Sequence, residues 1–198
     1  MKLFPTALPE IIEIRPTRHG DDRGWFSEVY RSDKLRDAGI DVAFVQDNES
    51  FSAHEGTVRG IHYQLDPHPQ AKLIRVISGS ILDVAVDLRR ASPTFGHHVA
   101  VTLSAEGGNQ LFIPAGFGHG LMTLEADVRV AYKVSDRYAP ECERAVRWND
   151  PDLAIRWPAD VPATLSGKDE VAPFLADQHD VFDRPSAEAQ PPIPECAP

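Results

Sequence analysis

Two polar residues stand where core residues are expected, within the stretch EGTVRGIHYQL at residues 55–65. They are Arg59 and His62, and Lys72 opens the next apolar run. An imidazole exchanges a proton near neutral pH, and an ammonium stabilises negative charge that develops on an oxygen. A histidine and a lysine in one pocket therefore suit removal of a proton next to a carbonyl group, with the lysine holding the enolate oxygen.

This chemistry needs two further groups, an acid that returns a proton and a carboxylate that orients the base. Tyr132, in VAYKV, is a candidate acid on an interior-type strand, although a tyrosine there is more often plain core packing. Asp169, in LSGKDE, follows a turn and could reach the base. Spacing alone does not select Asp169 over the other aspartates.

The segment PAGFGHG at residues 114–120 has the spacing Pro-x-Gly-x-x-His, with His119 as the histidine. This is the second motif of the cupin superfamily of small β-barrels. The first cupin motif supplies further metal ligands, but this chain has Gln64 and Lys72 at two of those positions. A divalent ion needs neutral or anionic donors, and an ammonium repels it. The sequence therefore predicts a cupin-like barrel whose site holds no metal.

Short alternating apolar runs, broken by Gly, Pro, Asn and Asp, predict that strands dominate the fold. In KLIRVISGSILDVAVDLR, apolar residues alternate with Asp83, Ala85 and Asp87, which predicts a strand with one buried face. The SGS break at residues 78–80 predicts a hairpin. The turn AEGG at residues 105–108 likewise predicts that the strands on either side of it pair.

Only RSDKLRDAGI, residues 31–40, has a clear helical pattern, with a Ser or Asp cap and Gly39 as a stop. A weaker helix is predicted near residues 169–176. The predicted fold class is therefore all-β, a cupin-type double-stranded β-helix (jelly roll) with a few short helices. We expect a single cupin-like domain over residues 1–177 and a proline-rich C-terminal tail over residues 178–198.

The composition bounds the class of protein. The 198 residues suffice for one domain with an ample core, and the net charge of −10 argues against binding to nucleic acid or an anionic membrane. No apolar run reaches 18 residues, and the N-terminal stretch lacks the apolar region of a signal peptide. Cys142 and Cys196 are far apart in the chain, which favours a reducing compartment, and we expect a cytoplasmic protein.

The chain resembles the dTDP-4-dehydrorhamnose 3,5-epimerase family of nucleotide-sugar epimerases over nearly its whole length, to about residue 176. Each matching stretch is weak alone, but their order and spacing are together highly specific. The stretches are DDRGWFSEVY, VQDNESFS, GTVRGIHYQ, QAKLIRVISGSILDVAVDLR, SPTFG, IPAGFGHG, YKVSDRYAPECE, WNDPDLAIRWP and LSGKDEVAPFL. One departure is Leu121, where the family usually has a phenylalanine.

The resemblance implies roles for the residues that suggested chemistry. His62 resembles the family's base, with Asp169 as its partner. Lys72 resembles the group that stabilises the C4 enolate, and Tyr132 the acid on the opposite face. The resemblance implies no cofactor, because the ketone of the substrate already acidifies both neighbouring carbons.

The resemblance also implies a set of substrate contacts and a homodimer. Arg23 and Arg59 resemble ligands of the pyrophosphate, a group that needs several cations in an otherwise acidic chain. Phe26 and Glu28 resemble positions that meet the nucleotide from the neighbouring subunit. The other implied substrate contacts are Gln46, Asn48, His119, Tyr138, Glu143 and Lys168.

The function implied is inversion of C3 and C5 in a dTDP-4-keto-6-deoxyhexose, from dTDP-4-dehydro-6-deoxyglucose to dTDP-4-dehydrorhamnose, in dTDP-rhamnose biosynthesis. An alternative is a C3-only epimerase of a deoxysugar pathway for a secondary-metabolite glycoside, because the catalytic residues are shared. Two other classes are a metal-dependent cupin enzyme and a non-catalytic sugar- or nucleotide-binding cupin. Lys72 argues against the first, and a base together with Lys72 and Tyr132 argues against the second.

Overall fold

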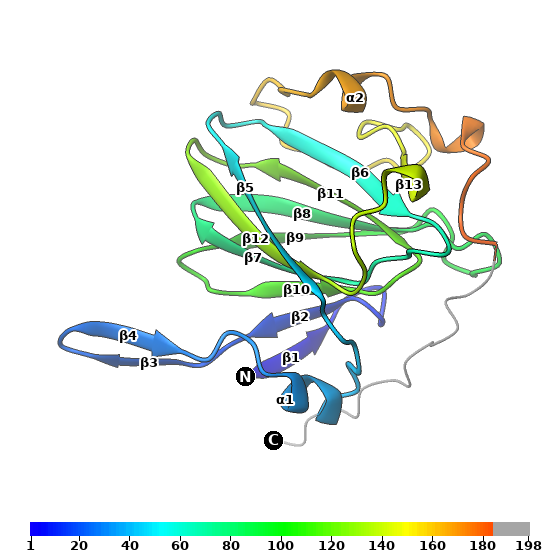
Figure 1. Cartoon of the computed structure of the whole chain (residues 1–198). Coiled ribbons are helices and arrows are strands. Elements are labelled where there is room, and N and C mark those ends of the chain that lie inside the picture. The colour runs from blue at the N-terminus through cyan, green and yellow to red at the C-terminus, as the bar shows by residue number, and fades with distance from the viewer. Residues whose placement is uncertain (184–198) are drawn as a thin grey trace.

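Two antiparallel sheets face each other across an apolar core in the computed structural model, which describes residues 1–183 (Figure 1). The six-stranded sheet consists, in spatial order, of β1 (Lys2–Pro5), β2 (Ile12–Arg15), β10 (Gln110–Ile113), β7 (Lys72–Ser78), β12 (Val128–Val134) and β5 (Gln46–Ser52). The five-stranded sheet consists of β13 (Glu143–Ala145), β6 (Val58–Gln64), β11 (Phe117–Thr123), β8 (Ser80–Asp87) and β9 (His98–Ser104). The predicted all-β jelly roll of cupin type is confirmed.

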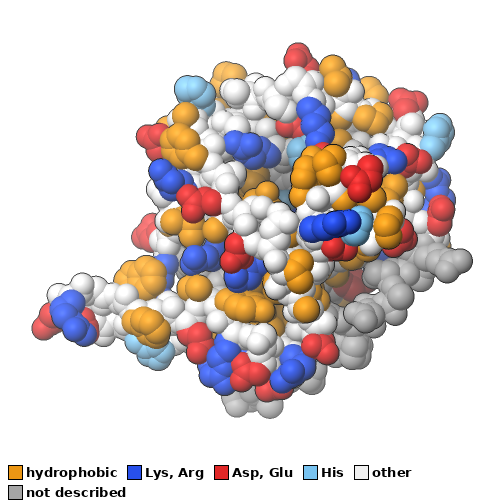
Figure 2. Space-filling model, in the orientation of Figure 1, with side chains coloured by type: hydrophobic (Ala, Val, Ile, Leu, Met, Phe, Trp, Pro, Cys, Tyr) orange, Lys and Arg blue, Asp and Glu red, His pale blue; other side chains and the backbone are white. Residues whose placement is uncertain are grey.

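A separate hairpin projects from this body. It consists of β3 (Arg18–Asp21) and β4 (Gly24–Ser27), and we call it the arm (Figures 1 and 2). Its aromatic residues are exposed, with 59% of Trp25 and 72% of Phe26 accessible to solvent. The arm therefore presents apolar surface away from the core of its own chain.

Consecutive strands of the body often lie in opposite sheets. Strands β7 and β8 are separated only by Gly79, which has a φ of +80°, and the chain passes there from one sheet to the other. The predicted hairpin at residues 78–80 is therefore wrong. The predicted pairing across AEGG is also wrong, because β9 and β10 lie in different sheets. Apolar alternation identifies a strand, but the packing of the two sheets decides its neighbours.

Strand β8 is buried on both faces rather than on one. Asp83 and Asp87 are both fully buried, which corrects the predicted solvent face. The outer face of the five-stranded sheet is covered by an apolar cluster that includes Val146, Leu153 and Phe182. Because this covering chain comes from the C-terminal part of the sequence, the local pattern in β8 did not indicate it.

The helices are few and short, as expected. Helix α1 (Ser32–Asp37) lies within the predicted residues 31–40, and its Leu35 packs into a cluster with residues of β2, β7 and β10. The second predicted helix is replaced by α2 (Gly167–Glu170) and the 3₁₀ helix η2 (Leu175–Asp177), and Pro173 lies between them. A further 3₁₀ helix, η1, spans Pro140–Cys142. Within residues 1–183, none of the helices has the length and apolar character required to cross a membrane.

The chain remains packed beyond the expected boundary at residue 177. The backbone N–H of Phe182 donates to the carbonyl of Leu88, and the N–H of Arg90 donates to the carbonyl of Phe182. The ring of Phe182 is 9% exposed and packs on Tyr63, with 5.7 Å between ring centroids. Residues 184–198 of the expected tail lie outside the described part of the chain.

Candidate active site

A cavity of about 560 Å³ lies between the two sheets, with walls from β5, β7 and β12 on one side and β6 and β11 on the other. Its lining includes all four predicted catalytic residues, His62, Lys72, Tyr132 and Asp169. The predicted contact residues that also line it are Gln46, Asn48, Arg59, His119, Tyr138 and Glu143. The structure thus brings together residues from six strands and α2.

A β-bulge explains why two residues three positions apart in β6 face the same cavity. Side chains of a regular strand alternate, so Arg59 and His62 should point to opposite faces. On β11, however, the partners of these residues are Leu121 and His119, only two positions apart, so β6 holds one extra residue. Gly60 occupies this bulge with a φ of +107°, where any Cβ would overlap the His119 carbonyl oxygen.

The ring of His62 is held by a buried carboxylate. Its Nε2 lies 2.6 Å from Oδ1 of Asp169, whose exposed fraction is 4%. The hydroxyl of Ser166 donates to Oδ2 of Asp169 at 2.8 Å, and Ser166 is also the N-cap of α2. The short helix therefore fixes the carboxylate, and the carboxylate fixes the imidazole.

The electrostatics of Asp169 favour its ionised form. Burial by itself would raise the pKa of Asp169, but hydrogen bonds from His62, the Ser166 hydroxyl and a backbone N–H outweigh burial and lower the pKa. An ionised Asp169 accepts the Nε2 proton of the imidazole, which leaves Nδ1 free to take up another proton. The pair is thus arranged as a general base with an orienting partner.

Lys72 is nearly buried, with an exposed fraction of 8%. Its ammonium has one hydrogen bond among the described residues, to the backbone carbonyl of His62 at 3.4 Å. Desolvation lowers the pKa of Lys72 to about 8, although the charges of Asp83 and Glu143 partly oppose this shift. At neutral pH the side chain is therefore mostly a cation with unused donors inside the cavity.

Tyr132 faces the cavity from the six-stranded sheet, whereas His62 faces it from the five-stranded sheet. Burial raises the pKa of Tyr132, and the charge of Arg59 partly offsets the effect. The phenol is therefore protonated at neutral pH and can donate. A base on one sheet and an acid on the other can act on opposite faces of a molecule between them.

His119 lies beside His62 on the neighbouring strand, and its Nε2 is 2.7 Å from Oδ1 of Asp83. The sequence singled out His119 but not Asp83. The signal that could have found it is an aspartate inside an otherwise apolar strand, which requires a partner if both strand faces are buried.

Polar contacts at the cavity mouth join three predicted contact residues. The hydroxyl of Tyr138 donates to Glu143 at 2.8 Å, and Lys168 forms an ion pair with the same carboxylate. Lys168 itself is not part of the cavity lining. Gln46 accepts from the backbone N–H of Tyr138 and donates to Asn48. Strand β5 is therefore bonded to the segment that carries Tyr138.

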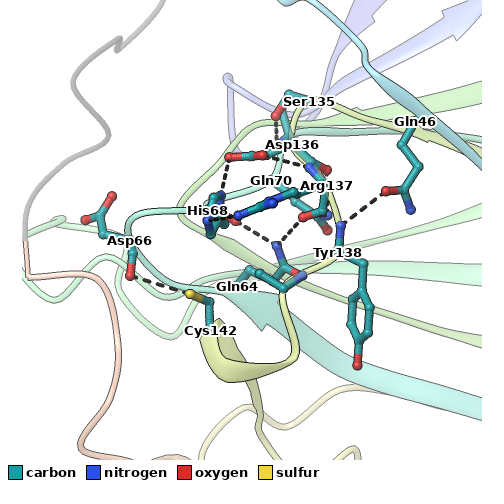
Figure 3. Close-up of polar contacts among 12 residues, drawn as sticks. Gln46, Gln64, Asp66, His68, Gln70, Ser135, Asp136, Arg137, Tyr138 and Cys142 are labelled. Atoms are coloured by element: carbon teal, nitrogen blue, oxygen red, sulfur yellow. Dashed lines mark hydrogen bonds and ion pairs between the residues drawn. The ribbon is translucent and has the colours of Figure 1, made fainter.

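The segment that carries Tyr138 is anchored by a glutamine network (Figure 3). The buried amide of Gln64 donates to the carbonyls of His68 and Arg137 and accepts from the N–H of Ala139. Gln70 donates to the Arg137 carbonyl as well. Gln64, which replaces a cupin metal ligand, is therefore engaged in holding two loops.

The donor set does not fit a metal ion. Within residues 1–183, no three His, Cys, Asp or Glu residues are grouped so that they could hold one. Glu143, a possible oxygen ligand, is already paired with Lys168, and the ammonium of Lys72 projects into the same cavity.

Besides Lys168, three predicted contact residues lie outside the cavity lining. Arg23 and Phe26 are on the arm. The side chain of Arg23 is 89% exposed, and its guanidinium pairs with Asp21. Glu28 follows the arm and pairs with Lys34 and Arg31. In this chain alone, these residues are separated from the group around His62.

Sequence reasoning also missed Ser166, which orients Asp169. Its signal was the spacing Ser-x-x-Asp before a short helix, in which the serine is the N-cap and the acidic residue lies in the first turn. Gln64 and Gln70 had no comparable signal, because their roles depend on loops brought together only by folding.

A family model, a curated relative and solved structures that resemble this chain all point to one family of enzymes. A family model described as dTDP-4-dehydrorhamnose 3,5-epimerase matches residues 5–177. The chain is 49% identical over 171 residues to a dTDP-4-dehydrorhamnose 3,5-epimerase of Sinorhizobium fredii, covering 86% of this chain and 88% of that protein. A crystal structure from Legionella pneumophila, in complex with dTDP-4-keto-L-rhamnose, has a TM-score of 0.89 and 41% identity, covering 94% of this chain and 99% of that one.

A second crystal structure, a dTDP-4-dehydrorhamnose 3,5-epimerase from Bacillus anthracis with TDP and PPi bound, has a TM-score of 0.85 and 45% identity. The match covers 88% of this chain and 99% of the Bacillus anthracis chain. The likeness extends over most of this chain, and the identity is far above the level at which only a fold is shared. This chain therefore belongs to the dTDP-4-dehydrorhamnose 3,5-epimerase family.

Proposed function

We propose that this chain is an isomerase that inverts C3 and C5 of dTDP-4-dehydro-6-deoxyglucose to form dTDP-4-dehydrorhamnose. The observation that carries the proposal is the opposition of His62, backed by Asp169, and Tyr132 across one cavity that also holds the Lys72 ammonium. The family relationship supplies the substrate class, a dTDP-linked 4-keto sugar.

In the first step, Nδ1 of His62 removes the proton from a carbon next to the C4 ketone. The electron pair of the broken C–H bond forms the enolate double bond, and the carbonyl oxygen becomes negative. Asp169 stabilises the imidazolium that results, because its carboxylate accepts the Nε2 proton. A positioned base of this kind contributes roughly 10²–10⁴-fold to the rate.

The negative oxygen is stabilised by the ammonium of Lys72. Because that group is nearly buried, its charge acts through a medium of lower dielectric than water and interacts strongly with the oxygen. The enolate then takes a proton from Tyr132 at the same carbon but on the opposite face. The configuration is inverted, and exchange with solvent returns His62 and Tyr132 to their starting states.

Binding of the nucleotide diphosphate is assigned to the cations and aromatic groups at the cavity mouth. Arg59 lines the cavity, and Tyr138 is 53% exposed beside it. We propose that the arm of a second copy brings Arg23 and Phe26 to this mouth in a homodimer. The exposed aromatic surface of the arm and the separation of these residues from their own cavity support this arrangement. Within residues 1–183, the buried thiol of Cys142 forms no disulfide, which supports a reducing, cytoplasmic location.

The experiment that tests the proposal is turnover of dTDP-4-keto-6-deoxyglucose in D₂O, followed by NMR of the product. We expect deuterium at both C3 and C5. The His62→Ala variant, checked for an unchanged circular dichroism spectrum, serves as the control and should incorporate deuterium at least about 10²-fold more slowly. Label at C3 alone would identify a 3-epimerase instead, and a product free of solvent deuterium would exclude the enolate mechanism.

A further inference from the structure

Asp83 is an ionisable residue of the interior that the mechanism above does not use. Asp83 lies on β8 and is 0% exposed. It is on the same face of the strand as Ile81 and Ala85, which belong to the apolar core between the two sheets. Within residues 1–183, Oδ2 of Asp83 is buried and has no hydrogen-bond partner. A buried carboxylate with an unused oxygen is strongly unfavourable unless positive charge lies near it.

Two groups near Asp83 can carry that charge. The first is His119, whose Nε2 is 2.7 Å from Oδ1. On the paired strands β8 and β11, Asp83 is opposite Leu121 and Ala85 is opposite His119. The aspartate and the histidine are therefore diagonal neighbours, and their side chains meet inside the sandwich. The contact holds the His119 ring with Nδ1 on the side away from Asp83.

The second group is Lys72 on β7, in the opposite sheet. The charge of Asp83 is the largest influence that supports protonation of Lys72 against desolvation, and Glu143 is the next. Besides Glu143, the other titratable groups that line the cavity with Lys72 are Arg59, His62, Tyr63, His119, Tyr132, Tyr138 and Asp169. Of the carboxylates, Glu143 is already paired with Lys168 and Asp169 with His62. Within residues 1–183, Asp83 is the one of the three with a fully buried oxygen that has no hydrogen-bond partner.

We propose that Asp83 is a positioning residue of the epimerase site, whose buried carboxylate keeps Lys72 an ammonium and holds the ring of His119. This inference rests on the proposed function, in which the Lys72 cation stabilises the enolate oxygen. Asp83 acts through Lys72 and His119 and has no contact with the reacting carbon. Without its charge, Lys72 loses its proton at a lower pH, and the site then lacks a cation for the enolate.

The experiment compares Asp83→Asn with the unchanged protein over a range of pH. The amide has the shape of the carboxylate and can still accept from His119, so the fold should persist. We expect the basic limb of the kcat/KM profile, near the Lys72 pKa of about 8, to move down by about one unit. The loss in kcat/KM should be roughly 5-fold at about pH 8, approach about 10-fold at higher pH, and shrink at lower pH.

A readout that does not depend on turnover follows the amine itself. In protein labelled with ¹³C-lysine, the Cε signal of Lys72 is identified by its absence from Lys72→Met. Its titration midpoint should move to lower pH in Asp83→Asn. If the unchanged protein fails to epimerise the sugar nucleotide, the proposed function is wrong, and this midpoint still decides the role of Asp83.

The matched control is Asp150→Asn, another buried aspartate. Asp150 is 2% exposed, lies outside the cavity lining, and accepts from the backbone N–H groups of Asp152, Leu153 and Leu175. The Asp150→Asn variant should leave the titration midpoint of Lys72 unchanged. If Asp83→Asn does not fold, Asp83→Ser provides the same test with a smaller neutral side chain. A Lys72 midpoint that stays in place in a folded Asp83 variant would overturn the proposal.

Discussion

His62 and His119 lie directly opposite each other on the paired strands β6 and β11, and each ring has Nε2 against a buried aspartate. The distances are 2.6 Å to Asp169 and 2.7 Å to Asp83. The two carboxylates come from different elements, α2 and β8. Each imidazole is therefore held in one orientation by a separate part of the chain, which gives the cavity a rigid polar wall.

The first prediction concerns the orientation of the base. Asp169→Asn keeps the size of the side chain but cannot stabilise the imidazolium, and the amide can select the wrong tautomer of His62. We expect kcat for epimerisation to fall about 10²–10⁴-fold with little change in KM. Steady-state kinetics with the dTDP-4-keto sugar measure both values.

Ser166→Ala is the graded companion of this variant. It removes the hydroxyl that donates to the Asp169 carboxylate and accepts from the Asp169 N–H, but leaves the carboxylate next to His62. We expect kcat to fall only about 10-fold or less, because a single hydrogen bond is worth about 1 kcal/mol. A loss as large as that of Asp169→Asn would contradict the view that the ionised carboxylate is the main partner of the base.

The second prediction separates proton removal from proton return. Tyr132→Phe deletes the phenol on the six-stranded sheet but leaves the base on the five-stranded sheet. We expect net inversion to slow more than hydrogen exchange at the abstracted carbon. NMR in D₂O follows exchange and inversion in the same sample, and an equal loss of both would argue against Tyr132 as the separate acid.

The third prediction concerns a conflict between stability and function at Lys72. Its pKa in the folded chain, about 8, is below the ordinary value of 10.5, so the unfolded chain binds the proton more tightly. Burial of the ammonium therefore reduces stability below about pH 8, and this penalty is relieved as the pH rises from about 8 to 10.5. We expect Lys72→Met to raise the free energy of unfolding at pH 7 by about 1–3 kcal/mol.

Denaturant unfolding at several pH values measures this effect. The stabilisation by Lys72→Met should diminish toward pH 10.5, while epimerisation is lost at every pH. A variant that is less stable than the unchanged protein at pH 7 would show that the charges of Asp83 and Glu143 need the ammonium more than burial disfavours it.

The fourth prediction concerns the chain after residue 177. Phe182→Ala removes a ring that packs on Tyr63, the neighbour of His62 on β6. We expect the free energy of unfolding to fall by about 2–4 kcal/mol. Phe51→Ala is the control, because this ring is 48% exposed and its loss should change stability by about 0.5 kcal/mol or less.

Truncation provides an independent check of the same segment. A chain that ends at residue 183 should keep the stabilisation by Phe182, whereas one that ends at residue 177 should lose it. Equal stability of the two truncated chains would place the domain boundary at residue 177 after all. Thermal unfolding, followed by circular dichroism, distinguishes these outcomes.

Much of the fold could be predicted because its signals are local. Alternating apolar residues identified the strands, and the cap and stop around residues 31–40 identified α1. The two hairpins were wrong because the partner of a strand depends on contacts far along the chain. Strand β7, for example, pairs with β10 and β12 rather than with β8, which follows it directly.

The site was predictable to the extent that its residues were unusual for their surroundings. Arg59 and His62 stood out in an apolar strand, and Lys72 in the next one. Asp169 did not stand out, because it is 107 positions from His62 and only folding brings the two together. Asp83 was assigned to a solvent face because the apolar residues of β8 predict one core, but Asp83 faces the interior between the sheets, and chain from beyond residue 145 covers the opposite face with Val84 and Val86.

The sequence by itself determined which chemical groups are available, which segments are strands, and the resemblance to an epimerase family. Only the tertiary structure decided that a bulge at Gly60 turns Arg59 and His62 to one cavity, and which carboxylate serves each imidazole. The physical reason is range. Strand propensity and turn chemistry act over a few residues, whereas the desolvation and charge pairing that tune this site act between groups that meet only when the two sheets close.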